Sequence, residues 1–262
     1  MGREKFVRGS KFVTKSVANF FMDYIDIVSF YRYNAIEDKL HDVILKKINC
    51  RRLFMPKVSE EVLLARREEI IDACAKLYET MNFKDITLKE IGKVTTFNRT
   101  AIYNYFNTKE EIFLALMQRE YDLWVADLEQ LLSAHESLSH DELADALSRS
   151  LEKRSRLLKL LSMNHFDMEG NSRYENLVEF KRSYGKSMQA VRHCLDKFCP
   201  EMNEAAKQSF IYAYFPFIYG IYPYAVVTEE QKKAMAEAGV DYKYLSIYEI
   251  SYNCLRKLLG VD

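Results

Sequence analysis

Apolar residues recur every three or four positions along most of this chain, and polar residues occupy the positions between them. Ile70, Ala73, Cys74, Leu77 and Met81 follow this spacing near the end of the first third. A period close to 3.6 residues is typical of a helix with one buried face. The pattern predicts an all-α protein, with helices over about 66–81, 109–132, 139–161, 172–199, 203–227, 228–239 and 242–259.

The segment 87–111 contains three helix starts in a short run. Thr87 with Glu90, and Thr108 with Glu111, have the spacing of a capping box, in which the hydroxyl and the carboxylate satisfy free amides of the first turn. Asn98 is a suitable N-cap for a helix between them. Two short helices joined by a tight turn, and followed by a long helix, are predicted, which is the order of a helix-turn-helix.

The second short helix, predicted over 98–106, would expose polar side chains that suit DNA. Ile102 and Phe106 fall on one side of it, which leaves the other side to residues that can pair with base edges: Asn98, Arg99, Thr100 and Asn104. The segment from 87 to 109 is also basic, with three lysines and an arginine against a single acid before Glu110. Affinity for phosphates follows from that charge. The alternative is a helical hairpin used for packing alone.

These residues resemble the N-terminal domain of TetR-family transcriptional regulators. The match runs from about Arg66 to Met117 and is carried by Ile86 with Thr87, by Ile91, and above all by Tyr-Asn-Tyr-Phe-Asn-Thr-Lys-Glu-Glu at 103–111. The resemblance implies that the helix 98–106 enters the major groove, that Tyr103 and Lys109 hold phosphates and that Thr87 anchors the first short helix. The expected DNA-binding residues are Thr87, Asn98, Arg99, Thr100, Tyr103, Asn104, Tyr105 and Lys109.

The sequence departs from the family pattern at two glycines. The glycine usual between the short helices is Thr96, and the one usual at the end of the first long helix is Asn82. Asparagine tolerates the left-handed conformation, and we expect it at Asn82 and again at Asn107. A β-branched Thr96 would be strained there, so the turn is expected to take another conformation. The operator sequence read by residues 97–100 is therefore expected to differ from those of other family members.

The resemblance also implies a C-terminal domain for effector binding and dimerisation over 109–262, after a DNA-binding domain over 59–108. The helices predicted near 203–227 and 242–259 would form the homodimer interface, and a two-fold dimer matches a palindromic operator. A repressor released from DNA by a small-molecule effector is the expected function. Candidate pocket residues combine apolar faces with polar tips, although core packing is the alternative for each: Trp124, His165, Phe166, Tyr184, Met188, Tyr212 and Tyr219. The aromatic run 210–224 is expected to be buried.

Composition and motifs exclude several other classes of protein function. The formal net charge is zero. The five cysteines are irregularly spaced, with no CxxC and no nearby cluster of histidines, so neither a metal site nor a disulfide framework is predicted. Free thiols fit a reducing cytoplasm, where Cys194 and Cys199 could be redox-sensitive. The sequence lacks a glycine-rich phosphate loop and a recognisable nucleophile with partners, so neither enzymatic activity nor a cofactor is expected. The sequence contains no uninterrupted apolar run long enough to predict a membrane span.

Residues 1–54 differ in charge from the rest of the chain. They contain eleven Lys or Arg against six Asp or Glu, about +5, which leaves about −5 for the remainder. One interpretation is a sequence upstream of a natural start at Met55. The others are a basic arm that adds DNA contacts, and a helical interaction or membrane-associated protein that uses this arm.

Overall fold

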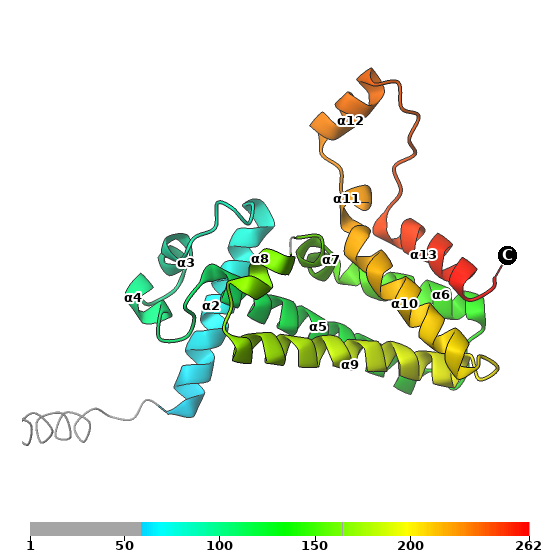
Figure 1. The fold of residues 1–262 in the computed structure, drawn as a ribbon, viewed down its shortest axis with the longest axis horizontal. Helices are drawn as coiled ribbons and strands as arrows, with labels where there is room; N and C mark the ends of the chain where they lie inside the picture. The colour runs from blue at the N-terminus through cyan, green and yellow to red at the C-terminus, as the bar shows by residue number, and fades with distance from the viewer. Residues whose placement is uncertain (1–58, 164, 262) are drawn as a thin grey trace, which may run out of the picture. The chain divides into compact units, whose positions relative to one another are not determined.

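A computed structural model describes residues 59–163 and 165–261 (Figure 1). The N-terminal extension 1–54 and the predicted start at Met55 lie outside these residues. The described chain contains helices and no strand, which confirms the all-α prediction. The helices are α2 (Glu60–Thr80), α3 (Leu88–Val94), α4 (Arg99–Ile102), α5 (Lys109–Ala134), α6 (His140–Lys153), α7 (Ser155–Leu161), α8 (His165–Gly170), α9 (Tyr174–Phe198), α10 (Glu204–Gly220), α11 (Tyr222–Ala225), α12 (Glu229–Glu237) and α13 (Ile247–Leu258).

The helices α2, α3 and α4 form a small N-terminal head. Their apolar faces meet the first turns of α5 in one core, to which Ile70, Cys74, Ile86, Ile91, Ile102, Phe106, Ile112 and Phe113 contribute side chains with no more than 1% exposure. Cys74 lies so deep that burial raises the pKa of its thiol to about 12, although Arg119 and Lys109 act in the opposite direction. This thiol is therefore a packing group and is protonated at neutral pH.

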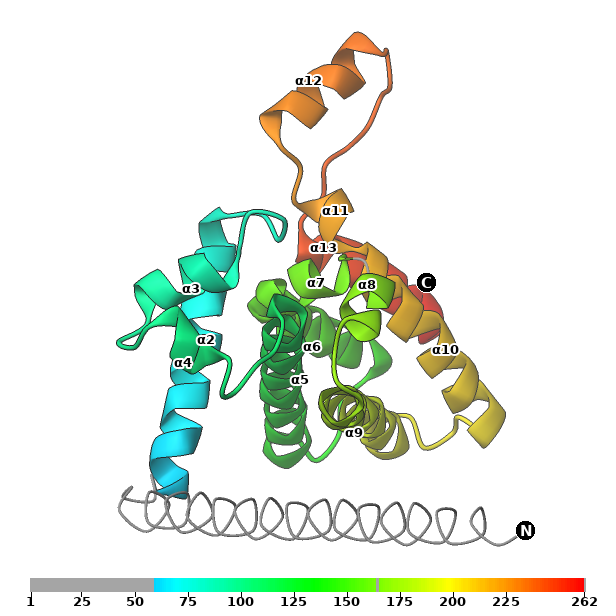
Figure 2. The same cartoon turned by 60° about the vertical axis from the view of Figure 1, so that its left-hand side comes forward.

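The C-terminal body is built around α5, which packs along α9 and also contacts α6, α7 and α8 (Figures 1 and 2). The last helix, α13, packs against α6. Two stacked tyrosines strengthen this second pair, because the hydroxyl of Tyr248 donates to Asp145 at 2.6 Å and that of Tyr252 donates to Asp141 at 2.9 Å.

Most of the predicted helix starts are confirmed by their caps. The side chains of Thr87, Asn98, Thr108, Ser139 and Thr228 each accept a hydrogen bond from an amide three residues further on. The second half of the two boxes predicted at residues 87 and 108 is wrong. The carboxylate of Glu90 pairs with Lys93 at 2.9 Å, and that of Glu111 accepts from the amide of Asn107 at 2.7 Å, so neither bonds to its cap amide. The helix predicted from residue 172, with Ser172 as its expected cap, starts later. The hydroxyl of Ser172 donates to the carbonyl of Met168 at 2.7 Å, and α9 begins at Tyr174.

The single helix predicted over 139–161 is interrupted at Arg154, which has φ −103° and ψ 38° between α6 and α7. Asp127 on α5 explains the position of the break. Its carboxylate accepts from Lys153 and from Nε of Arg154, each at 2.6 Å, and this pair of bonds draws the chain towards α5. The carboxylate of Asp127 is partly desolvated, but the hydrogen bonds from both cations hold its pKa below the ordinary value.

The C-terminal helices are shorter than predicted. The aromatic run is divided between α10, which contains Pro216, and the short α11, and it is not wholly buried because Tyr212 is 68% and Tyr224 60% exposed. The last helix begins at Ile247, where Ser246 and Glu249 form a capping box, and not near residue 242.

Between α11 and α13 the chain makes an excursion, residues 226–246, which carries α12 away from the neighbouring helices in both views (Figures 1 and 2). Among the described residues no single helix is long and apolar enough to cross a membrane. The pair formed by 204–225 and 229–237 meets that test of length and composition only when joined across an 84° bend.

Candidate nucleic-acid interface

The turn between α3 and α4 avoids the strain expected at Thr96. No non-glycine residue in the described part of the chain has a positive φ, so the left-handed conformations predicted for Asn82 and Asn107 are also wrong. Thr95 is extended instead, with φ −82° and ψ 159°. The turn is fixed from outside, because the hydroxyl of Thr96 donates to the carboxylate of Glu69 on α2 at 3.1 Å.

The close approach between the two short helices occurs at Gly92. A Cβ on this residue would lie 3.2 Å from the backbone nitrogen of Arg99, which is tighter than ordinary packing. The glycine that brings α3 near α4 is therefore inside α3, and the turn itself does not need one. This explains how the chain keeps the arrangement without a glycine at position 96.

The second short helix is itself shorter than predicted. Regular α-helix ends at Ile102, and the chain continues in turns to Phe106, whose amide donates to the carbonyl of Ile102 at 3.0 Å. Ile102 and Phe106 are buried, as expected of the inward side. The other side presents Asn98, Arg99, Thr100, Tyr103 and Asn104 to solvent.

Two of these exposed residues hold each other in place. Nη2 of Arg99 donates to the hydroxyl of Tyr103 at 2.7 Å, and the guanidinium lies 5.6 Å from the centre of the tyrosine ring. The acceptor oxygen of Asn98 is already used by the amide of Ala101 at 3.1 Å. Asn98 therefore acts as a cap in this structure, and the fork of Arg99 lies at the start of the exposed face.

A basic hollow of about 380 Å³ lies beside α4 and is lined by Thr87, Leu88, Lys89, Arg99, Lys109 and Glu110. It brings together three of the predicted DNA-binding residues, which come from the starts of three successive helices. Lys109 is positioned by the head: its Nζ donates to the carbonyl of Phe83 at 2.7 Å and lies 4.1 Å from the centre of that ring. Lys89, one of the three lysines that make this segment basic, also lines the hollow.

Tyr105 lies apart from the exposed face. Its side chain is partly buried, and its ring is 6.4 Å from that of Phe97. Its carbonyl accepts a hydrogen bond from Nη2 of Arg173 at 3.0 Å. The structure thus places Tyr105 in packing, together with a contact to the body.

Arg173 and Glu111 form the main polar connection between the recognition segment, residues 98–107, and the body. Nothing in the sequence indicated this pair. Glu111 is 1% exposed, and its two oxygens accept from Nε and Nη2 of Arg173 at 2.7 and 2.9 Å. The amide of Asn107 also donates to it at 2.7 Å. Burial disfavours the carboxylate, but the bonds from Arg173 outweigh it and leave the pKa of Glu111 below its ordinary value.

Three of the seven predicted effector residues belong to one aromatic cluster. Trp124 is 0% exposed and Tyr184 partly buried, and both rings pack against Phe215, with centroids 6.1 and 5.6 Å away. Tyr219 reaches the same cluster through its hydroxyl, 3.4 Å from that of Tyr121.

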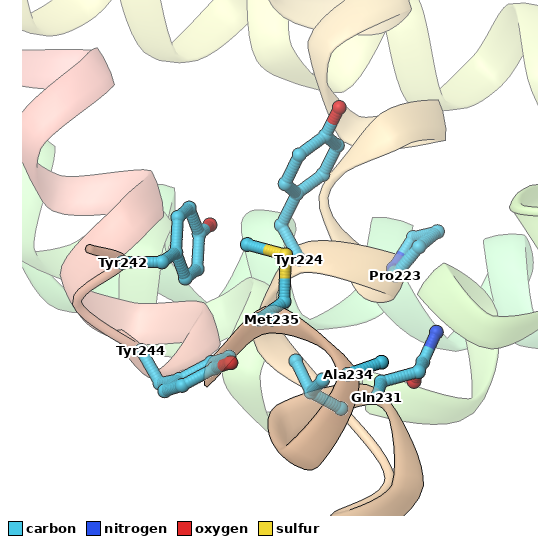
Figure 3. A pocket seen from close by; sticks show the side chains of 8 residues that line it. Pro223, Tyr224, Gln231, Ala234, Met235, Tyr242 and Tyr244 are labelled. Atoms are coloured by element: carbon cyan, nitrogen blue, oxygen red, sulfur yellow. The ribbon is translucent and has the colours of Figure 1, made fainter. Parts of the chain in front are cut away.

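The other four predicted effector residues are dispersed. Met188 is partly buried on α9, Tyr212 is exposed on α10, and His165 and Phe166 lie in α8. A cavity of about 380 Å³ also opens against α12 (Figure 3). It contains none of the seven, being lined by Pro223, Tyr224, Val227, Gln231, Ala234, Met235, Tyr242 and Tyr244.

Comparisons with known proteins agree with a helix-turn-helix regulator. A family model described as bacterial regulatory proteins of the tetR family matches residues 70–116, and one described as a tetracyclin repressor-like C-terminal domain matches residues 118–244. These two consecutive matches cover the head and most of the body. The chain belongs to the TetR family.

Individual relatives are more distant. The HTH-type transcriptional repressor Rv1474c of Mycobacterium tuberculosis is 31% identical over 72 residues, 28% of this chain and 38% of that protein. AcnR of Corynebacterium diphtheriae, also an HTH-type transcriptional repressor, is 29% identical over 101 residues, 37% of this chain and 53% of AcnR. The chain thus matches about half or less of the length of these relatives.

Among solved structures, the transcriptional regulator FadR from Bacillus subtilis, in complex with stearoyl-CoA, aligns with a TM-score of 0.50 at 14% identity. The alignment covers 74% of this chain and 97% of FadR. At this identity the likeness establishes the fold only.

Proposed function

We propose that the chain is a transcriptional repressor that binds a palindromic operator as a homodimer and leaves it when a small molecule binds. The observation that carries the proposal is the basic hollow, because Thr87, Arg99 and Lys109 line it beside an exposed, N-capped helix. A short helix with free polar side chains fits the major groove, and lysines at its flanks suit the phosphates on either side.

The proposed contacts divide into two kinds. Arg99, Thr100 and Asn104 read base edges, with Arg99 best suited to the two acceptors of a guanine. Thr87, Lys89, Tyr103 and Lys109 hold phosphates. Asn98 contributes by starting the helix, and Tyr105 by packing it against the body.

A homodimer is proposed through α10 and α13. The outer side of α10 carries Tyr212, which is 68% exposed, next to the exposed small residues Ala213 and Pro216. A second copy related by a two-fold axis would cover this surface and present two recognition helices to successive major grooves. Two half-sites about 10 base pairs apart suit that geometry.

Effector control is proposed to act through α8 and the segment before α9. The carbonyl of Asn171 accepts from the hydroxyl of Thr108 at 3.0 Å, and Arg173 bonds to Glu111 and to the carbonyl of Tyr105. A ligand that moves α8 would therefore displace the recognition segment without touching it. The domain division at residue 108 and the cytoplasmic location are part of the same proposal, and no catalytic role is assigned.

A gel-shift titration tests the proposal. The full-length chain is titrated against DNA from upstream of its own gene and against a scrambled duplex of equal length and composition. We expect retention of the upstream DNA at salt concentrations that release the scrambled duplex. Equal retention of the two duplexes would contradict sequence-specific binding.

Arg99→Ala is expected to weaken operator binding by about 1–3 kcal/mol and to relax the preference at one base pair of each half-site. The reason is the loss of a two-pronged donor at the exposed start of α4. Binding to a panel of operators, each changed at one base pair, measures the effect. The same loss on operator and on scrambled DNA would remove Arg99 from the base-reading residues.

Lys109→Ala is expected to weaken binding to all sequences alike and to lower the slope of log K against log salt by about one. Tyr103→Ala should also weaken binding without changing base preference. The measurement is affinity at four or five salt concentrations on both duplexes. Lys233→Ala is the matched control, because this lysine lies on α12 with a side chain that is 78% exposed, and its removal should leave the slope unchanged.

A further inference from the structure

Three side chains with metal-binding atoms meet where α9 turns towards α10, beside the start of α6. His140 is the first residue of α6, Cys199 is the C-cap of α9, and Glu201 follows two residues later. Their ligand atoms lie within 4.8 Å of one another, and Nε2 of His140 is 2.8 Å from Oε1 of Glu201. The fold alone brings them together, since 61 residues separate His140 from Glu201.

The donor set is chemically suited to zinc. An imidazole nitrogen, a thiolate and a carboxylate oxygen are its ordinary ligands, and three such groups plus water make a four-coordinate site. Ligand atoms around a tetrahedral zinc ion lie roughly 3.3–3.8 Å apart, so His140 and Glu201 would separate slightly and Cys199 would move closer. Exposure permits this, because the side chain of Glu201 is 59% and that of His140 35% exposed, whereas Cys199 is buried.

We propose that His140, Cys199 and Glu201 bind a divalent transition-metal ion of the zinc type, with water as the fourth ligand. The simpler explanation is a surface His–Glu pair next to a buried thiol that only packs. Three donors of different chemistry, from two segments and converging on one point, favour the metal site. Nζ of the nearby basic residue Lys207 is paired with Asp196 at 2.6 Å.

Occupancy of the site would tie two parts of the body together. His140 belongs to α6, against which α13 packs, and the segment 199–201 leads into α10. A metal ion at this point joins α6 to the segment 199–201 through its side-chain ligands. The three ligands come together only in the folded chain. Its expected effect is a rise in melting temperature that grows with metal concentration.

The test is a titration of the chelator-treated, full-length chain with Zn²⁺ alone, in competition with a colorimetric zinc chelator. We expect one strongly bound ion per chain, a weakening of at least about tenfold in Cys199→Ser and in His140→Gln, and a similar loss in Glu201→Gln. Cobalt in place of zinc should give a thiolate charge-transfer absorption in the near ultraviolet, which Cys199→Ser removes.

Cys194→Ser is the matched control, since this cysteine is also buried on α9 but lies outside the group of three. It should keep both the zinc affinity and the cobalt absorption. Melting without metal identifies any variant that fails to fold, and His140→Gln, altered at a partly exposed residue, decides the question if Cys199→Ser is one. Absence of binding by the native chain, or equal affinity in the native chain and both variants, would overturn the proposal.

Discussion

Replacing Arg173 by alanine is expected to lower the free energy of unfolding by about 2 kcal/mol. The arginine is the main partner of the carboxylate of Glu111, which is only 1% exposed, whereas the arginine side chain is itself 46% exposed. Desolvation of an unpaired charge is the main cost. Urea unfolding followed by circular dichroism measures the change.

Arg182→Ala is the matched control for Arg173. Its guanidinium pairs with Glu179 on the surface of α9, and both side chains are more than half exposed, so a loss below about 0.5 kcal/mol is expected. The double variant Arg173→Ala with Glu111→Gln should recover part of the stability, because the buried charge is then gone. Similar losses in Arg173→Ala and Arg182→Ala would show that the buried pair has no special weight.

The pair of Arg173 and Glu111 is also expected to make the free energy of unfolding fall in acid. The pKa of Glu111 is lower in the folded chain than its ordinary value, so its contribution to stability is complete above that value, about 4.3, and is lost as pH falls through the lowered pKa. The native chain and Arg173→Ala should therefore differ most at neutral pH and converge in acid. A constant difference from pH 7 down to acid would contradict this.

Replacing Trp124 by alanine is expected to lower the free energy of unfolding by about 3–5 kcal/mol. The side chain is 0% exposed and packs against the rings of Tyr121, Tyr214 and Phe215, with centroids 6.1–6.5 Å away. Its indole nitrogen donates to Ser150 at 3.0 Å. The substitution removes a large part of the body's core, whether or not an effector also touches it.

Trp124→Phe separates the ring from the hydrogen bond and should lose less than half as much, since an aromatic ring still fills the cluster. Tyr174→Ala is the control for an aromatic residue outside the core, because Tyr174 is 75% exposed, and it should change stability by about 0.5 kcal/mol at most. Near-native stability of Trp124→Ala would contradict its role in packing the core.

The fold was predictable wherever local chemistry decides it. Thr87, Asn98, Thr108, Ser139 and Thr228 start helices through contacts within four residues, and the sequence displays such contacts directly. Errors arose where a distant residue intervenes. Asp127 interrupts the helix expected over 139–161, and no pattern near residue 154 reveals a carboxylate on α5.

The candidate site likewise has a part that local sequence predicts and a part that depends on residues far apart in the chain. Exposure of Arg99 and Tyr103 followed from helical spacing, and the family resemblance indicated that Lys109 belongs with them. The connection between Glu111 and Arg173 joins residues 62 positions apart, and the group around Cys199 is equally remote in sequence. Spacing also cannot distinguish a core aromatic residue from a ligand contact, so the sequence pattern alone does not separate the buried Trp124 from the exposed Tyr212.

The buried position of Trp124 has a practical consequence, since it is the chain's single tryptophan. Its fluorescence comes from one place in the body, surrounded by the tyrosine and phenylalanine rings of the aromatic cluster. The protein thus carries an intrinsic optical reporter, and compounds can be screened by emission shift or quenching without any label on protein or DNA. A compound that alters this emission and also releases the operator would be an effector whose binding reaches the aromatic cluster.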